Sequence, residues 1–252
     1  GAGCGLGRAG GCGVWVGGVM LDASHITTFP ALEQGSPEWL AARRGMLTAS
    51  EVKLIMTPTG KIADNDKTRA HVWELAAQRI SGHVEPHYVS DDMLRGHDEE
   101  LLARQTYDQC IASTHTVGFI VNRKLGFPIG CSPDWLVGAD GGGESKSRRQ
   151  KFQVQTICEN VLTETCPDEF ALQVQACLWI TERKWWDFCS YSNGLHMAVI
   201  RVLPDAEWQS RFEEAAIAFE DKVQRAVMTY RAALASGARL IPTERREIQE
   251  MF

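Results

Sequence analysis

The sequence predicts an α+β fold in which a mixed central β-sheet is flanked by helices. Apolar residues recur at helical spacing in the first and last parts of the chain. Short β-like runs, separated by Gly, Pro and Asp turns, lie between them. The 252 residues, 44% hydrophobic and 23% charged, are enough to bury a full core. We therefore expect a single globular domain, which we place at residues 20–252.

Residues 1–19 are dominated by glycine and show no usable period. Met20 follows them, so the segment resembles a tag or translated upstream sequence, and we expect it to be non-functional. No run approaches the roughly 20 apolar residues of a membrane span, and the glycine-rich start lacks the apolar region of a signal peptide. These features predict a soluble, cytoplasmic protein without a membrane partner.

Helix signals begin after residue 34. The motif SPEW at residues 36–39 supplies an N-cap, a first-turn proline and an acid near the positive end of the helix dipole, so a helix should run to about Arg44. The motif TASE at residues 48–51 is expected to begin a second helix, and residues 71–80 a third.

A fourth helix is expected over residues 96–110. Glu100, Ala103 and Tyr107 fall at positions i, i+3 and i+7, which places a carboxylate on the same face as core-type residues. An unpaired charge is costly in such a position. Glu100 is therefore a candidate for a functional role.

The remaining elements alternate between strands and helices. They are strands at 118–121, 129–137 and 144–146, a helix at 168–181, strands at 185–192 and 198–203, and a helix at 205–235. In the last helix Trp208, Phe212 and Phe219 belong to an apolar stripe at helical spacing, which indicates core packing rather than a cofactor site.

Two short motifs carry the chemistry. Ser132-Pro133-Asp134 is followed, ten residues after the aspartate, by Glu144-Ser145-Lys146. Residues i and i+2 of a strand share a face, so Glu144 and Lys146 should point to the same side, where Asp134 from a neighbouring strand could meet them. Acidic groups beside a lysine suit a site that holds Mg²⁺ and activates a water against a phosphodiester. The alternative is an exposed charged hairpin.

Composition excludes several other classes. The net charge of −6 and a pI near 5.7 argue against nucleic-acid binding through bulk charge, so any DNA binding must be local. The eight cysteines contain no C-x-x-C pair, which argues against a zinc ribbon or a close-spaced iron–sulfur site. The seven histidines contain no H-E-x-x-H motif of the zinc-protease kind.

From about Gln34 to Val227 the sequence resembles the phage lambda exonuclease family and the wider YqaJ-type viral recombinase nucleases. The resemblance is carried by QGSPEWLAARRGMLTASEV from residue 34, G-x-x-x-E-x-x-A from residue 96, the SPD and ExK motifs, QVQACLWIT from residue 173, and the Trp185–Trp186 strand with the following helix. It implies a restriction-endonuclease-like PD-(D/E)xK core. It also implies a substrate of linear double-stranded DNA with a 5′-phosphorylated end.

The resemblance also implies roles for individual residues. At the metal site, Asp134, Glu144 and the main-chain carbonyl of Ser145 would be ligands, and Glu100 would bind the metal directly or through water. Lys146 would position the attacking water, and Gln173 would orient the water or the scissile phosphate. Two Mg²⁺ ions are implied, with Mn²⁺ able to substitute. At the end of the DNA, Arg43, Ser50 and Ser132 would bind the 5′-phosphate. Met93 would act as a wedge that separates the two strands.

The implied activity is digestion of one strand from its 5′ end to 5′-mononucleotides, leaving a 3′ single-stranded overhang. In the family the enzyme is a ring-shaped homotrimer, and its partner is a single-strand annealing recombinase. A phage or prophage gene expressed in a bacterial cell is the implied setting. A channel would reconcile the acidic chain with DNA binding, because only its lining needs to be positive.

The chain departs from the family pattern at three positions. Gly143 and Ser145 stand where apolar strand residues are usual, so we expect a looser catalytic hairpin. Phe170 replaces a tyrosine, so a hydroxyl is lost near Gln173. The alternatives are an endonuclease of the same core, a catalytically weak DNA-end-binding recombination scaffold, and an α+β domain whose charges are only surface features.

Overall fold

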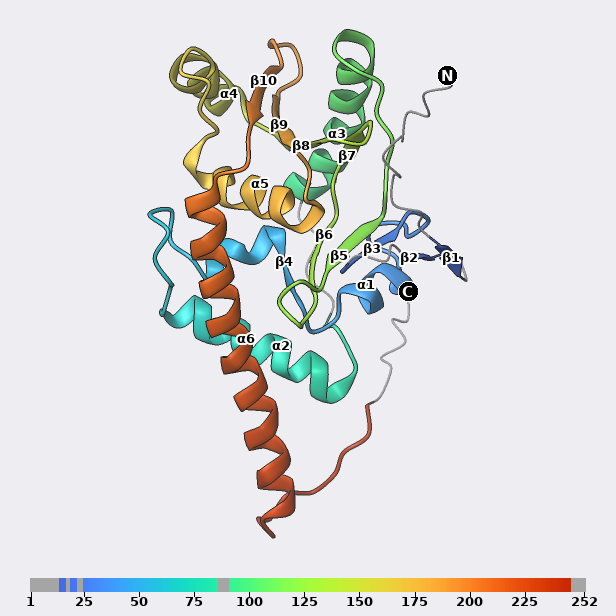
Figure 1. Ribbon diagram of the computed structural model, residues 1–252, viewed down its shortest axis with the longest axis vertical. Coiled ribbons are helices and arrows are strands. Elements are labelled where there is room, and N and C mark those ends of the chain that lie inside the picture. Colours follow the sequence, from blue (N-terminus) through green and yellow to red (C-terminus); the bar gives the residue numbers. More distant parts are fainter. Residues whose placement is uncertain (1–13, 17–18, 22–24, 86–90, 246–252) are drawn as a thin grey trace, which may run out of the picture.

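The computed structural model of the chain describes residues 14–16, 19–21, 25–85 and 91–245, and for residues 14–16, 19–21, 91–95 and 97 it describes the backbone alone. The fold is α+β, with mixed β-sheets flanked by helices, and this confirms the predicted fold class (Figure 1). The strands form two sheets, whereas the sequence led us to expect one central sheet.

The first sheet has six strands in the order β1-β2-β3-β5-β6-β4. Its strands are β1 (Val14–Val16), β2 (Val19–Leu21), β3 (Ile26–Phe29), β4 (Leu47–Thr48), β5 (Phe119–Asn122) and β6 (Ile129–Cys131). β4 and β6 are parallel, and the other neighbours are antiparallel. β1 and the first residue of β2 lie in the segment 1–19 that we expected to stand apart from the domain.

The second sheet has four strands in the order β10-β9-β8-β7. They are β7 (Trp135–Val137), β8 (Gly141–Ser147), β9 (Trp185–Tyr191) and β10 (Ala198–Val202). The single strand expected over residues 129–137 is therefore two strands, β6 and β7, in different sheets. The break falls at residues 132–134, where Pro133 has no amide hydrogen for a ladder bond.

The helices agree with the sequence signals to different degrees. They are α1 (Pro37–Arg43), the 3-10 helix η1 (Ala49–Leu54), α2 (Asp66–Ser81), α3 (Asp91–Cys110), α4 (Gln150–Thr156), the π-helix η2 (Ile157–Val161), α5 (Asp168–Thr181) and α6 (Ala206–Ala235). α1, α5 and α6 confirm the prediction. α2 begins five residues earlier than expected because the side chain of Asn65 caps it.

The core is organised around α5. Most of its residues are buried, and it packs against η1, β5, β9 and α6. α6 in turn packs on α2 and runs along one side of the molecule (Figure 1). Within the described ranges, no helix combines the length and apolar character that crossing a membrane requires.

The glycines of β8 serve packing rather than flexibility. A Cβ at Gly143 would lie 2.1 Å from Nε1 of Trp135, and one at Gly142 would lie 2.3 Å from Cζ3 of Trp186. β8 pairs with β7 on one side and along its whole length with β9 on the other. The looser hairpin that we expected from Gly143 is therefore wrong, because indole rings fill the space that the missing side chains leave.

Candidate active site

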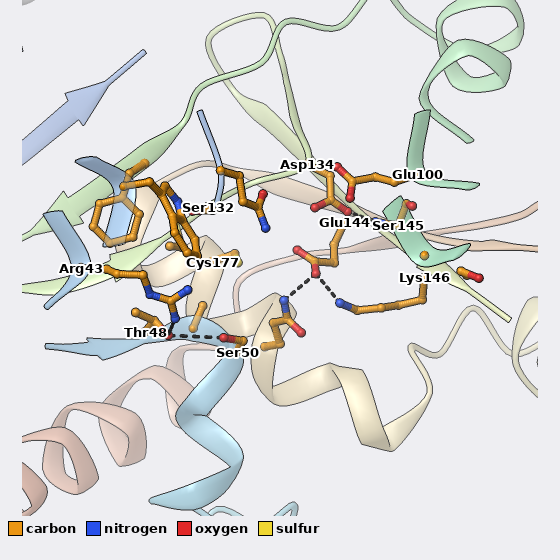
Figure 2. A pocket seen from close by; sticks show the side chains of 18 residues that line it. Arg43, Thr48, Ser50, Glu100, Ser132, Asp134, Glu144, Ser145, Lys146 and Cys177 are labelled. Carbon is orange, nitrogen blue, oxygen red and sulfur yellow. Dashed lines mark hydrogen bonds and ion pairs between the residues drawn. The ribbon is translucent and has the colours of Figure 1, made fainter. Parts of the chain in front are cut away.

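β8 carries the central residues of the site. Lys146 Nζ donates a hydrogen bond of 2.5 Å to Glu144 Oε1, so these two side chains share one face of the strand (Figure 2). Nε2 of Gln173, on α5, donates a hydrogen bond to the same carboxylate oxygen. Glu144 is only 3% exposed. The helix and the strand therefore hold one buried carboxylate between two donors.

Asp134 lies immediately before β7 and faces β8. Its Oδ2 accepts a hydrogen bond of 2.6 Å from the backbone N–H of Ser145. Burial and the nearby carboxylates of Glu144 and Glu100 raise the pKa of Asp134 well above its usual range. Glu100 comes from α3, and Figure 2 shows it beside Asp134. Three carboxylates from three elements thus meet at one end of the site.

The acidic end suits a divalent cation. Glu144 Oε2 is buried and has no hydrogen-bond partner within the described structure. Over the same residues, no group of three or more His, Cys, Asp or Glu side chains is placed to hold a metal ion by itself. Mg²⁺ does not need one, because it commonly uses one or two carboxylates and keeps waters or substrate phosphates as its other ligands. A cation here would satisfy the orphaned oxygen and relieve the repulsion that raises the pKa of Asp134.

Lys146 supplies positive charge beside these carboxylates. Burial lowers the pKa of Lys146, but the charges of Glu144 and Asp134 outweigh burial, and the net effect is a raised pKa. The ammonium group also lies 5.7 Å from the ring centroid of Phe170, the residue that stands in place of a tyrosine. In the described state Lys146 is therefore a charged hydrogen-bond donor to Glu144.

Arg43, Thr48 and Ser50 form the other end of the site. Arg43, the last residue of α1, donates from Nη2 to Thr48 Oγ1 at 3.2 Å. Thr48 Oγ1 lies 3.3 Å from Ser50 Oγ, and Figure 2 shows both contacts. The guanidinium of Arg43 and the hydroxyl of Ser50 are donors that match a phosphate, whereas the hydroxyl of Thr48 donates to Glu51. We call Arg43, Thr48 and Ser50 the phosphate-type cluster. The sequence indicated Arg43 and Ser50 but missed Thr48.

Trp39 connects Ser132 to this phosphate-type cluster. Its Nε1 donates to Ser132 Oγ at 2.8 Å, and its ring centroid lies 4.3 Å from the guanidinium carbon of Arg43. Ser132 Oγ donates in turn to the carbonyl of Gly118 at 2.9 Å. The signal for Trp39 was present in the sequence, because residues four apart on a helix are neighbours and Trp39 precedes Arg43 by four.

Both ends open into one pocket with a cavity volume of about 490 Å³. Every site residue suggested by the sequence lines it except Met93: these are Arg43, Ser50, Glu100, Ser132, Asp134, Glu144, Ser145, Lys146 and Gln173. Two buried thiols, Cys131 and Cys177, also line it. Met93 belongs to the first turn of α3, and its side chain lies outside the described part of the structure.

Solved structures share this fold. An alkaline exonuclease from Laribacter hongkongensis, LHK-Exo, is 27% identical, with a TM-score of 0.70 over 81% of this chain and 100% of that chain. Its complex with dAMP matches to the same extent. A phage-related exonuclease from Haemophilus somnus 129PT, at 12% identity, has a similar fold, with a TM-score of 0.56 over 73% of this chain and 96% of that one. No curated protein sequence matches the chain.

The family model described as the YqaJ-like viral recombinase domain matches residues 38–184. This range begins in α1, beside Arg43, and continues beyond α5, so it includes both ends of the pocket. The match covers more than half of the chain. The chain is therefore a member of the YqaJ-like viral recombinase family.

Proposed function

We propose that the chain is a Mg²⁺-dependent exonuclease that digests one strand of linear double-stranded DNA from its 5′ end. One observation carries this proposal: three carboxylates suited to a cation and the phosphate-type cluster, with Ser132 beside it, line the same pocket. Its volume of about 490 Å³ falls within the range of pockets that hold small ligands. The similarity to LHK-Exo, which was solved in complex with dAMP, supports a nucleotide in this pocket.

The oxygen donors at the acidic end would hold the metal. They are the carboxylates of Asp134 and Glu144, the main-chain carbonyl of Ser145, and Glu100, directly or through water. Two Mg²⁺ ions held there, or Mn²⁺ in their place, would supply positive charge for an in-line displacement at phosphorus.

Lys146 and Gln173 act on the water and the phosphate. Both side chains are already fixed by their bonds to Glu144, so they need little rearrangement to orient a water against the scissile phosphate. The water adds to phosphorus, and the bond from phosphorus to the 3′ oxygen breaks. The water gives up a proton to the solvent as it adds, and the 3′ oxygen takes up a proton from the solvent as it leaves.

The phosphate-type cluster makes this an exonuclease rather than an endonuclease. Consecutive phosphates of a strand are one nucleotide apart. When the terminal phosphate is bound at Arg43 and the next phosphate lies beside Glu144, hydrolysis there releases a single 5′-mononucleotide. The cut leaves a phosphate on the new 5′ end. Each turnover therefore regenerates the group that Arg43, Ser50 and Ser132 bind, and the product is a 3′ single-stranded overhang.

The assembly and the partner are also part of the proposal. We infer a homotrimer around the DNA and a single-strand annealing recombinase that receives the overhang. The acidic net charge of −6 favours an arrangement in which only a channel lining is basic. Sedimentation or light scattering would measure the mass of the assembly, and a monomer would overturn the ring.

The test is digestion of linear duplex DNA with and without 5′-phosphates in Mg²⁺. We expect mononucleotides from 5′ ends, with activity abolished by Lys146→Ala and the preference for phosphorylated ends removed by Arg43→Ala. Arg44→Ala is a matched control, because Arg44 is the next residue but donates to the carbonyl of Gly82 at 2.6 Å and does not line the pocket.

Other outcomes would redirect the proposal. Cuts in closed circular DNA would indicate an endonuclease of the same core. Binding to DNA ends without cleavage, in any divalent cation, would indicate a recombination scaffold. If Mn²⁺ gave no heat of binding in calorimetry, the charges of the pocket would be structural only.

A further inference from the structure

A half-buried carboxylate, Glu51, stands behind the phosphate-type cluster. It lies on η1 and accepts two hydrogen bonds from Thr48 at Oε2, one of 2.9 Å from the backbone N–H and one of 2.7 Å from the hydroxyl. Its other oxygen, Oε1, lies 3.5 Å from Nη2 of Arg43. Glu51 itself does not line the pocket, so its contacts act on residues that do.

His71 supports Glu51 from the side away from the pocket. It lies on α2, is 2% exposed, and stacks on Phe219 of α6 with ring centroids 5.3 Å apart. Its Nδ1 lies 3.0 Å from Glu74, while Nε2 lies 3.6 Å from Glu51 Oε2 and has no hydrogen-bond partner within the described structure. Burial lowers the pKa of His71, but Glu51 and Glu74 outweigh burial and raise it.

We propose that Glu51, supported by His71, is a positioning residue for recognition of the terminal 5′-phosphate. It fixes the hydroxyl of Thr48 as a donor toward Glu51, which leaves the oxygen of Thr48 free to accept from Arg43. It also holds one nitrogen of the guanidinium. Thr48 thereby holds Arg43 in position through its hydroxyl oxygen and does not itself donate to the phosphate. This inference rests on the proposed function.

The distances favour positioning over competition for Arg43. The short bonds of Glu51 go to Thr48, while its contact with Arg43 is 3.5 Å. Both contacts of Arg43 with this network use Nη2. A guanidinium has five N–H donors, so three remain on Nη1 and Nε for a phosphate. The network therefore orients Arg43 without consuming the donors that a phosphate would use.

Glu51→Gln tests this with little disturbance of the fold. The amide oxygen can take the place of Oε2 and keep both bonds from Thr48, while the NH₂ group then faces Nη2 of Arg43, donor against donor. The readout is the ratio of kcat/KM on 5′-phosphorylated and 5′-hydroxyl duplex. We expect the ratio to fall by about tenfold, the effect of one lost hydrogen bond to a charged group, with the rate on 5′-hydroxyl ends nearly unchanged.

Controls separate this inference from a general loss of structure and from the proposed function. Glu38→Gln, an exposed carboxylate on α1, should leave the ratio unchanged. A general structural defect would lower kcat/KM on both substrates together and leave their ratio unchanged, so an unchanged ratio overturns the inference. A raised ratio overturns it equally, because Glu51 would then compete with the phosphate for Arg43. Thr48→Val serves if Glu51→Gln fails to fold, and it too should lower the ratio. If Arg43→Ala leaves the ratio unchanged, the proposed phosphate site itself fails.

Discussion

Gly143→Ala is expected to destabilise the protein because the added methyl group meets a buried ring. The new Cβ would lie 2.1 Å from Nε1 and 2.3 Å from Cε2 of Trp135. Contacts between carbon atoms are ordinarily about 3.5 Å, so the new Cβ and Cε2, at 2.3 Å, must move apart by roughly 1.2 Å. Trp135 is fully buried and packs on Tyr107, with ring centroids 5.2 Å apart, so it has little room to move.

The expected cost is about 2–3 kcal/mol, the upper range for overpacking a close-packed core. Urea unfolding followed by tryptophan fluorescence measures it, with Gly96→Ala as control, because a Cβ there meets nothing within 4 Å. Gly143 adjoins Glu144, so activity should fall as well.

Trp135→Phe in the same background sharpens this test. The smaller ring removes the pyrrole atoms that collide with the methyl group, and Nε1 of Trp135 is buried without a hydrogen-bond partner, so no bond is lost with it. The two substitutions together should be more stable than the sum of their separate costs predicts, by about 1 kcal/mol or more. Strictly additive costs, or a Gly143→Ala protein as stable as wild type, would refute the steric argument.

Three further predictions concern the site and its support. Trp39→Phe, which removes the donor to Ser132 Oγ, should cost about 1 kcal/mol in unfolding free energy and weaken binding of phosphorylated ends in a titration. Mg²⁺ at about 100 times its Kd should raise the unfolding free energy by about 2.7 kcal/mol, and Glu144→Gln should remove that gain. Because the pKa of His71 is raised in the folded state, its charged form stabilises the fold fully below about pH 6.5, the unfolded pKa, and this contribution is lost as the pH rises through the folded pKa. The unfolding free energy, measured from pH 6 to 9, should therefore fall less in His71→Gln than in wild type.

The sequence predicted what local signals encode. The N-cap of α1 at Ser36, the bounds of α5 and the shared face of Glu144 and Lys146 all depend on residues close to one another in the chain. The division of the strands into two sheets was not predicted, because strand pairing depends on partners far apart in sequence. In the same way, the indole rings that cover the glycines of β8 come partly from β9, more than forty residues later.

The candidate site was predicted more completely than the fold that supports it. The motif residues could be named because each motif is short, but Trp39 meets Ser132 across 93 residues of sequence, and no pattern in either segment indicates that bond. Glu51 illustrates the same limit: as the third residue after Thr48 it looks like an ordinary capping residue, which it is. Its second role follows only from the side chains that α1 and α2 bring to it.

The two positively charged side chains that line the pocket, Arg43 and Lys146, are each held by a carboxylate. Arg43 lies against Glu51 and Lys146 against Glu144, so each positive group has a carboxylate partner before any DNA is bound. Such pairs reduce the rearrangement needed when a phosphate arrives, which is the main way a fixed polar site lowers a barrier. The pairs differ in one respect, because Glu144 lines the pocket and Glu51 does not. The partner of Lys146 is therefore available to a metal ion, while the partner of Arg43 lies outside the pocket, where in our proposal it holds Arg43 in position in addition to capping η1.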